Sequence, residues 1–147
     1  MPKSTTSPTG YPRGPRSTKK RFLIVTAVIE LGAGFALLCS PSATLALLIG
    51  SGLNTSAAVT LGRVAGAALC ALSVACWLAR GDTQSRAARG LVATMLLYNV
   101  ATVAFLAFAG LGLKLHGVAL WPAVVLHAAM AGWCIACLRR SPRHVMD

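Results

Sequence analysis

The chain has 147 residues, of which 56% are hydrophobic and only 12% are charged, and its mean hydropathy is +0.69. Water-soluble domains carry about 25% charged residues, so this composition excludes a soluble globular domain and indicates a single membrane domain. The net charge of +11 also occurs in nucleic-acid-binding proteins, but here the cations flank apolar segments. We therefore expect anionic lipid head groups as partners, and no nucleic acid.

Residues 1–20 form a basic N-terminal tail. They contain four prolines, two glycines and five Lys or Arg, and too few apolar side chains to form a core, so we expect them to be disordered. Lys19, Lys20 and Arg21 stand directly before the first apolar segment. Because cations accumulate on the cytoplasmic side of membrane spans, this position predicts a cytoplasmic tail.

Residues 22–40 form the first predicted span. They carry one charge, Glu30, and a helix of this length rises about 28 Å, enough to cross the hydrocarbon core of a bilayer. A cleaved signal peptide is the alternative interpretation. However, Glu30 interrupts the apolar run, and the run is longer than the roughly 7–15 residues of a signal-peptide core. We therefore expect the span to be retained.

A short apolar segment follows at residues 42–50. Pro41 suits the first turn of a helix, Gly50 suits its end, and the run between them is too short to cross the membrane. We expect a short interfacial helix on the outer face of the membrane. Residues 54–56, Asn-Thr-Ser, then offer turn and N-cap chemistry for the next helix.

The second predicted span covers about residues 57–79 and carries small residues at regular spacing. Gly62 and Gly66 are four residues apart, so they share one helix face and allow a second helix to approach closely. Together with Gly32 and Gly34 of the first span, they are the expected helix-packing residues.

Two further spans complete the predicted bundle, at about residues 91–113 and 118–138. A polar loop at residues 80–90 precedes the third span, and residues 141–147 form a second cytoplasmic tail. The sequence thus predicts an all-α transmembrane four-helix bundle over residues 21–140, with a short interfacial helix after the first span.

The distribution of cations predicts that both termini are cytoplasmic. Six Lys or Arg fall within residues 1–21, three in the loop at residues 80–90 and three at the C-terminus, which is twelve of fourteen. Only Lys114 falls in an outer loop, and Arg63 lies within a span. This asymmetry follows the positive-inside rule and predicts a multi-pass protein of a bacterial inner membrane.

Each span contains one strongly polar residue: Glu30, Arg63, Asn99 or His127. Counted at about 1.5 Å per residue from the cytoplasmic arginine that bounds each span, Glu30, Asn99 and His127 lie about 13, 15 and 18 Å deep. Arg63 lies about 25 Å deep, from where it could reach toward Glu30 or the outer head groups. Because a charge facing lipid costs roughly 2.5–3.5 kcal/mol, we expect these groups to turn inward, with Tyr98 beside them.

The predicted polar core has two interpretations, which the sequence leaves open. It is either a structural hydrogen-bond network that sets helix register, or a site for a small ligand, solute or proton. In the second interpretation Glu30 carries the charge and His127 is its proton partner. Arg63 then attracts anions or acts as a gate, and Asn99 orients the bound group.

Cys134 and Cys137 match the C-x-x-C pattern of redox proteins. A redox pair of this kind needs a helix N-terminus, whose dipole stabilises the thiolate, whereas this pair falls near the C-terminal end of a span. His127 is two helical turns, about 10 Å, from Cys134, which is too far for a shared metal ion. We interpret the thiols as buried, expect neither metal nor cofactor, and find no catalytic arrangement that would indicate an enzyme.

The arrangement of these motifs resembles small bacterial four-span membrane proteins, broadly of the DoxX-like type. The resemblance covers about residues 22–138 and implies an inner-membrane four-helix bundle. DoxX-like proteins have been linked to respiratory or sulfur redox chemistry, for which this chain has no outer-face cysteine pair. The residues that carry the resemblance are Glu30, Gly32, Gly34, Pro41, Gly62, Arg63, Gly66, residues 76–80, Tyr98, Asn99, Trp121, Pro122 and His127.

The sequence therefore favours a non-enzymatic integral membrane protein whose polar core binds or passes a small solute or proton. Such a protein could act as an accessory subunit of a larger complex. One alternative is a membrane redox subunit that meets a quinone or thiols. Another is a purely structural assembly partner that uses the face of Gly62 and Gly66. A bundle of this size has little room for a pore of its own, so we expect a homo-oligomer or a larger membrane complex.

Overall fold

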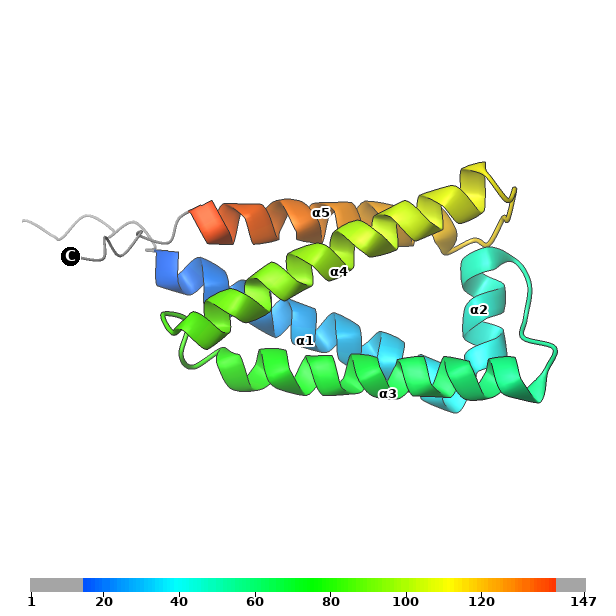
Figure 1. Cartoon of the computed structure of the whole chain (residues 1–147), viewed down its shortest axis with the longest axis horizontal. Helices are drawn as coiled ribbons and strands as arrows, with labels where there is room; N and C mark the ends of the chain where they lie inside the picture. The colour runs from blue at the N-terminus through cyan, green and yellow to red at the C-terminus, as the bar shows by residue number, and fades with distance from the viewer. Residues whose placement is uncertain (1–14, 140–147) are drawn as a thin grey trace, which may run out of the picture.

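The computed structural model describes the backbone of residues 15–139 and the side chains of residues 18–139. In this range the chain forms five α-helices and no strand, which confirms the predicted all-α bundle with a short helix after the first span (Figure 1). The predicted tail at residues 141–147, and residues 1–14 of the N-terminal tail, lie outside the described residues. The helices are α1 (Pro15–Cys39), α2 (Pro41–Ile49), α3 (Ser56–Ala79), α4 (Arg86–Leu111) and α5 (Leu120–Arg139).

Two helices begin earlier than the hydropathy indicates. Helix α1 begins at Pro15, inside the segment expected to be disordered, where proline suits the first helical turn. Helix α4 begins at Arg86, inside the expected polar loop, because the Ser85 hydroxyl accepts a hydrogen bond from the Ala88 backbone N–H at 3.1 Å. Both extensions are basic, so the apolar pattern alone does not reveal them.

Three other helix ends follow the predicted signals. Pro41 stands in the first turn of α2, and Gly50 ends that helix in the left-handed conformation, with φ of 83°. The Thr55 side chain caps α3 by accepting a hydrogen bond from the Ala58 backbone N–H at 3.1 Å. Local chemistry therefore determines where these helices begin and end.

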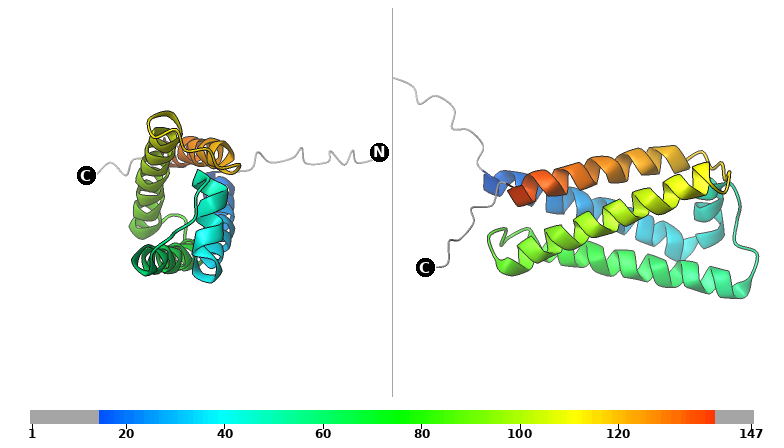
Figure 2. Two further views of the ribbon diagram at one scale, coloured as in Figure 1. Left: turned by 90° about the vertical axis from the view of Figure 1, so that its right-hand side faces the viewer. Right: turned by 45° about the horizontal axis from the view of Figure 1, so that its top comes forward.

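Four of the helices are long and apolar enough to cross a membrane. The beginning of α1, the α3–α4 loop and the end of α5 lie at one end of the bundle, while α2 crosses the opposite end (Figures 1 and 2). We call the first the basic end, because it carries all the described lysines and arginines except two, Arg63 and Lys114. The second is the α2 end.

The outer surface of the bundle is strongly apolar. Phe105 of α4 is 74% exposed and Leu78 of α3 is 72% exposed, and large aliphatic side chains are exposed along all four long helices. A water-soluble protein rarely exposes so continuous an apolar surface, whereas lipid chains would cover it in a bilayer. The side chains thus agree with helix length in indicating an integral membrane protein.

The long helices pack as two pairs, α1 with α3 and α4 with α5, while α3 and α4 touch only sparsely. In the first pair the backbones meet at Gly34 and Gly66. A Cβ atom at Gly34 would lie 2.7 Å from the Gly66 carbonyl oxygen, and the reciprocal distance is also 2.7 Å. Gly62 lies against Pro41 and Leu53, again in close contact. Small residues therefore allow α3 to approach both α1 and α2.

Gly32 does not take part in this packing, so its inclusion among the packing residues was wrong. No atom lies within 4 Å of the position where its Cβ would be, and the residue is exposed. The reason is helical geometry: two residues along a helix turn the side-chain direction by about 200°, so Gly32 and Gly34 face nearly opposite ways.

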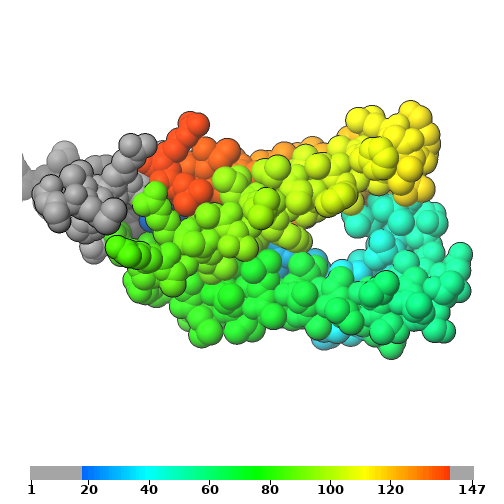
Figure 3. All heavy atoms as spheres, viewed as in Figure 1, coloured from blue at the N-terminus to red at the C-terminus, as the bar shows by residue number. Residues whose placement is uncertain are grey.

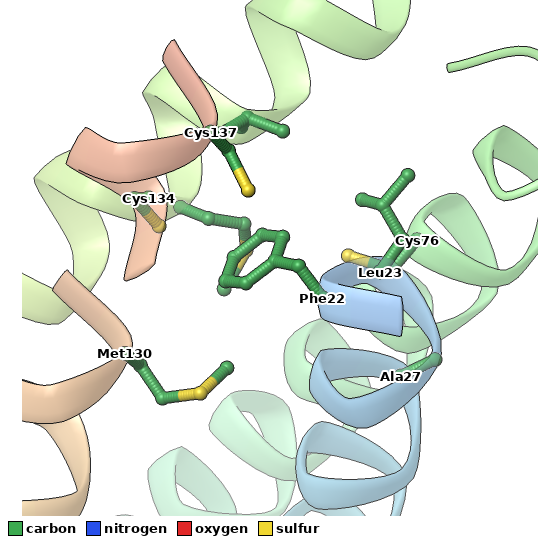
Figure 4. Packing of buried hydrophobic residues seen from close by; sticks show 9 residues of the cluster. Phe22, Leu23, Ala27, Cys76, Met130, Cys134 and Cys137 are labelled. Carbon is green, nitrogen blue, oxygen red and sulfur yellow. The ribbon is translucent and has the colours of Figure 1, made fainter. Parts of the chain in front are cut away.

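A cluster of buried apolar side chains fills the half of the bundle nearest the basic end, and we call it the basic-end cluster. Phe22 of α1 lies at its centre, with Cys134 and Cys137 of α5 on one side and Cys76 of α3 on the other (Figure 4). The Phe22 ring also meets the Trp133 ring edge to face, with centroids 5.7 Å apart. The members are Phe22, Leu23, Ala27, Cys76, Val92, Met95, Met130, Cys134 and Cys137.

At the opposite end, the α4–α5 loop is fastened to α2 by backbone contacts. The Ala119 N–H donates to the Leu47 carbonyl oxygen at 2.9 Å. A Cβ atom at Gly117 would overlap the carbonyl groups of Leu48 and Leu47, so only glycine fits there. This contact holds α2 across the end of the bundle.

Gly117→Ala is expected to detach α2 from the loop, because both overlapping groups are backbone and cannot move aside as a flexible side chain could. Hydrogen exchange of the amides in residues 41–49, followed by mass spectrometry in detergent micelles, would report the change as faster exchange. Gly81→Ala is the matched control, since nothing lies within 4 Å of its Cβ position. Equal exchange in the two variants would contradict the contact.

Candidate functional site

The structure brings together four of the five polar residues that the sequence singled out. The hydroxyl of Tyr98 on α4 donates to Oε2 of Glu30 on α1 at 3.4 Å. The ring of Tyr98 meets that of His127 on α5 edge to face, with centroids 5.7 Å apart, and His127 Nδ1 lies 2.8 Å from Asn99 Oδ1. Three helices therefore contribute to one polar cluster.

The partners within this cluster differ from those expected. The sequence suggested His127 as the proton partner of Glu30 and left Arg63 within possible reach of it, but in the structure Glu30 accepts from Tyr98. That bond is long for an O–H···O interaction, and an ionised carboxylate has about four acceptor positions. Glu30 is only 3% exposed. It is therefore a buried carboxyl group with most of its hydrogen-bonding capacity unused.

Asn99 fixes the orientation of His127. The Asn99 side-chain N–H donates to the Met95 carbonyl oxygen of its own helix at 2.7 Å, so its Oδ1 atom faces His127. Asn99 is 1% exposed, which keeps both bonds away from competing solvent. Since Oδ1 can only accept, Nδ1 of His127 is the donor in this pair.

Arg63 does not belong to the cluster. Its side chain is exposed on α3, and no salt bridge joins it to Glu30 within residues 18–139. The cause lies in the pairing of the helices: the face of α3 that meets α1 and α2 is occupied by Gly66 and Gly62, which leaves Arg63 on an outer face. The sequence allowed Arg63 to reach either toward Glu30 or toward the outer head groups. In the structure it is directed away from Glu30.

A cavity of about 420 Å³ adjoins Glu30, and we call it the membrane cavity. It runs from the layer of Glu30, Tyr98 and His127 toward the α2 end, where Leu45 and Leu48 of α2 form part of its wall. Its walls come from α1, α2, α4 and α5, and α3 contributes Leu69. In Figure 3 the molecule is hollowed between α4 and α3 beside α2, where the two helix pairs diverge.

The cavity is lined mainly by apolar side chains, with few polar ones among them. Its volume lies within the roughly 300–1,000 Å³ that is typical of small-molecule sites, and such sites commonly combine apolar walls with a few placed polar groups. Glu30 is the one acidic residue within the four long helices of the described chain. The arrangement can hold an apolar molecule and interact with one polar group on it.

Several polar contacts were not predicted from the sequence. The Ser73 hydroxyl of α3 donates to the Ala27 carbonyl oxygen of α1 at 2.6 Å, and the Lys19 ammonium group donates to the Thr83 carbonyl oxygen at 3.3 Å. Serine is common in transmembrane helices, so no sequence signal separates Ser73 from other serines, and the acceptor of Lys19 is a backbone carbonyl group, which every residue carries. The participation of α2 in the cavity wall was not expected either, since its placement depends on the Gly117 contact.

The cysteine pair does not belong to the membrane cavity. Cys134 and Cys137 are buried in the basic-end cluster and do not line the cavity. Within residues 18–139, no three His, Cys, Asp or Glu side chains are grouped as they would be around a metal ion. The chemistry that the cavity itself can offer therefore comes from Glu30, Tyr98, His127 and the hydroxyl groups of its wall.

The membrane cavity and its polar cluster are thus described by geometry alone. Comparison of the chain with protein-family models, with curated proteins and with solved structures found no match.

Proposed function

We propose that the chain is an integral inner-membrane protein that binds a small molecule with an apolar body and one polar end in the membrane cavity. The observation that carries this proposal is the position of Glu30, which is 3% exposed, lines the cavity and has one long hydrogen bond. A buried carboxyl group with so few partners is costly in an apolar environment. A bound polar group would offset that cost.

Binding explains the site better than passage across the membrane. The basic-end cluster, centred on Phe22, fills the bundle between the polar cluster and the basic end. The cavity therefore has no continuation on that side, and α2 covers the opposite end. The hollow between α3 and α4 faces the surroundings of the bundle, so a molecule dissolved in the bilayer can enter from the side (Figure 3).

The orientation in the membrane belongs to the same proposal. Lys20, Arg21, Arg86, Arg89 and Arg139 lie at the basic end, which we place on the cytoplasmic side among anionic lipid head groups. A relation to DoxX-like proteins remains part of the proposal on the motifs quoted above. Thiol redox chemistry at the C-x-x-C pair has less support, because a reactive cysteine needs access and Cys134 and Cys137 are buried.

Filling the cavity tests this proposal. In nanodiscs of phosphatidylcholine, decanol is expected to bind the wild-type protein saturably by calorimetry, above its partition into empty nanodiscs. Ala123→Phe should abolish this binding, because Ala123 of α5 lines the cavity and a phenyl ring would occupy its space.

Ala128→Phe is the matched control, since Ala128 is an exposed residue of the same helix that does not line the cavity. It should leave decanol binding unchanged. If decanol bound the wild-type protein no better than empty nanodiscs, or bound Ala123→Phe equally well, the proposed function would be wrong.

A further inference from the structure

The hydrogen-bonding groups that line the membrane cavity share one property, which indicates the chemical class of the ligand. This inference rests on the proposed function, that the cavity binds a small molecule. Five polar side chains line the cavity. They are Glu30, Thr44, Tyr98, Thr102 and His127.

The three hydroxyl groups of the cavity already use their protons. Tyr98 donates to Glu30 Oε2 at 3.4 Å. Thr44 donates to the Ser40 carbonyl oxygen at 2.9 Å, and Thr102 donates to the Tyr98 carbonyl oxygen at 2.9 Å. A hydroxyl group has a single proton, so each of these groups has only lone pairs left for a ligand.

His127 has the same property in its neutral form. Because Asn99 Oδ1 accepts from Nδ1, the proton of the neutral ring is on Nδ1. The other nitrogen, Nε2, then carries a lone pair and has no hydrogen-bond partner among residues 18–139. His127 therefore also presents an acceptor.

In its ionised form, Glu30 adds negative charge to this set of acceptors. No Lys, Arg or His nitrogen of the described chain forms a salt bridge with it, and its single bond to Tyr98 leaves further acceptor positions. A buried carboxylate is stabilised by an opposite charge that also donates hydrogen bonds. With Glu30 ionised and His127 neutral, the polar side chains of the cavity thus offer acceptors and one anion, with no unused donor.

We infer that the membrane cavity takes a lipophilic amine, whose protonated amino group donates hydrogen bonds to Glu30 and His127 while its hydrocarbon part lies among the apolar walls. An ammonium group supplies both the donors and the positive charge that the cavity lacks. A fatty acid or another anionic amphiphile would instead place two negative groups together.

Four ten-carbon amphiphiles test this inference in the full-length protein: decylamine, decyltrimethylammonium, decanol and decanoate. Calorimetry in phosphatidylcholine nanodiscs, corrected with empty nanodiscs, gives each dissociation constant. We expect decylamine to bind at least about tenfold more tightly than each of the others, because a hydrogen bond to a charged group contributes more than a neutral one. Decyltrimethylammonium carries the positive charge but has no hydrogen-bond donor. Its affinity therefore separates the effect of charge from the effect of hydrogen bonding.

Glu30→Gln should reduce the preference for decylamine over decanol to about threefold or less, since the amide has the same shape without the charge. Thr94→Val, at an exposed position of α4 outside the cavity, is the control and should keep the full preference. Circular dichroism and gel filtration identify a variant that does not fold. The comparison of the four probes on the wild-type protein does not depend on any variant.

The outcomes separate this inference from the proposed function. Saturable binding of all four probes with similar affinity, or a preference for decanoate, would overturn the inference and leave the cavity as a binding site. Equal affinity for decylamine and decyltrimethylammonium would overturn the role of the hydrogen bonds. If no probe bound saturably, both proposals would fail.

Discussion

Gly34→Leu is expected to lower the free energy of unfolding by about 3 kcal/mol or more, the largest effect of any single substitution proposed for this protein. Overpacking a well-packed core costs about 1–3 kcal/mol when side chains can rearrange. Here even the first added carbon would lie 2.7 Å from the Gly66 carbonyl oxygen and 2.9 Å from the Cys70 backbone nitrogen. Because these are backbone atoms of α3, the two helices must separate.

Separation of α1 from α3 has a large cost in a membrane for a specific reason. Helices in lipid are not driven together by the hydrophobic effect, so close packing and interhelical hydrogen bonds supply most of their attraction. The hydrogen bond from Ser73 to the Ala27 carbonyl oxygen, at 2.6 Å, joins the same two helices and depends on the same approach. Leucine at position 34 would therefore weaken both contributions.

Gly32→Leu is the matched control, because it introduces the same side chain two residues away on the same helix. Nothing lies within 4 Å of the Gly32 Cβ position, so the added side chain would face lipid. We expect its free energy of unfolding to stay within about 0.5 kcal/mol of the wild-type value. Titration from mild detergent into sodium dodecyl sulfate, followed by circular dichroism, gives both values. Equal losses in the two variants would mean that α1 and α3 do not meet as described.

Phe22→Ala is expected to cost about 2–3 kcal/mol, the second largest effect. Phe22 is 0% exposed at the centre of the basic-end cluster, and its ring packs against Trp133 with centroids 5.7 Å apart. Comparable substitutions in water-soluble cores cost roughly 3–5 kcal/mol, part of which is transfer from water. In a bilayer the transfer from water does not contribute to the cost. The cost then comes from the lost van der Waals contacts and from the new cavity.

Phe105→Ala makes the same chemical change at a lipid-facing position. Phe105 is 74% exposed on α4, so its ring has few protein contacts to lose, and we expect little change in stability. The same detergent titration measures both variants. Phe22→Ala should also make the thiols of Cys134 and Cys137 react faster with a maleimide, since the ring lies between them and Cys76 (Figure 4). Unchanged stability and reactivity would argue against the basic-end cluster as the packed half of the bundle.

The sequence by itself determined the architecture, because a bilayer accepts few solutions. A run of about 20 apolar residues must be helical in lipid, so the composition of the chain required membrane helices. Proline, glycine and threonine then determined several helix ends, as Pro41, Gly50 and Thr55 illustrate. Even the layer of Glu30, Asn99 and His127 followed from counting about 1.5 Å per residue along helices whose directions the cations predicted.

Only the tertiary structure decided which faces of these helices meet. Hydropathy has almost no periodicity in a helix that is apolar all round, so the sequence could not show that Gly34 packs while Gly32 faces outward. The rotation of each helix about its own axis could not be predicted for the same reason. The exposure of Arg63 and the bond from Tyr98 to Glu30 both depend on that rotation. The membrane cavity exists because the two helix pairs diverge toward the α2 end, and that divergence depends on packing between residues far apart in the chain.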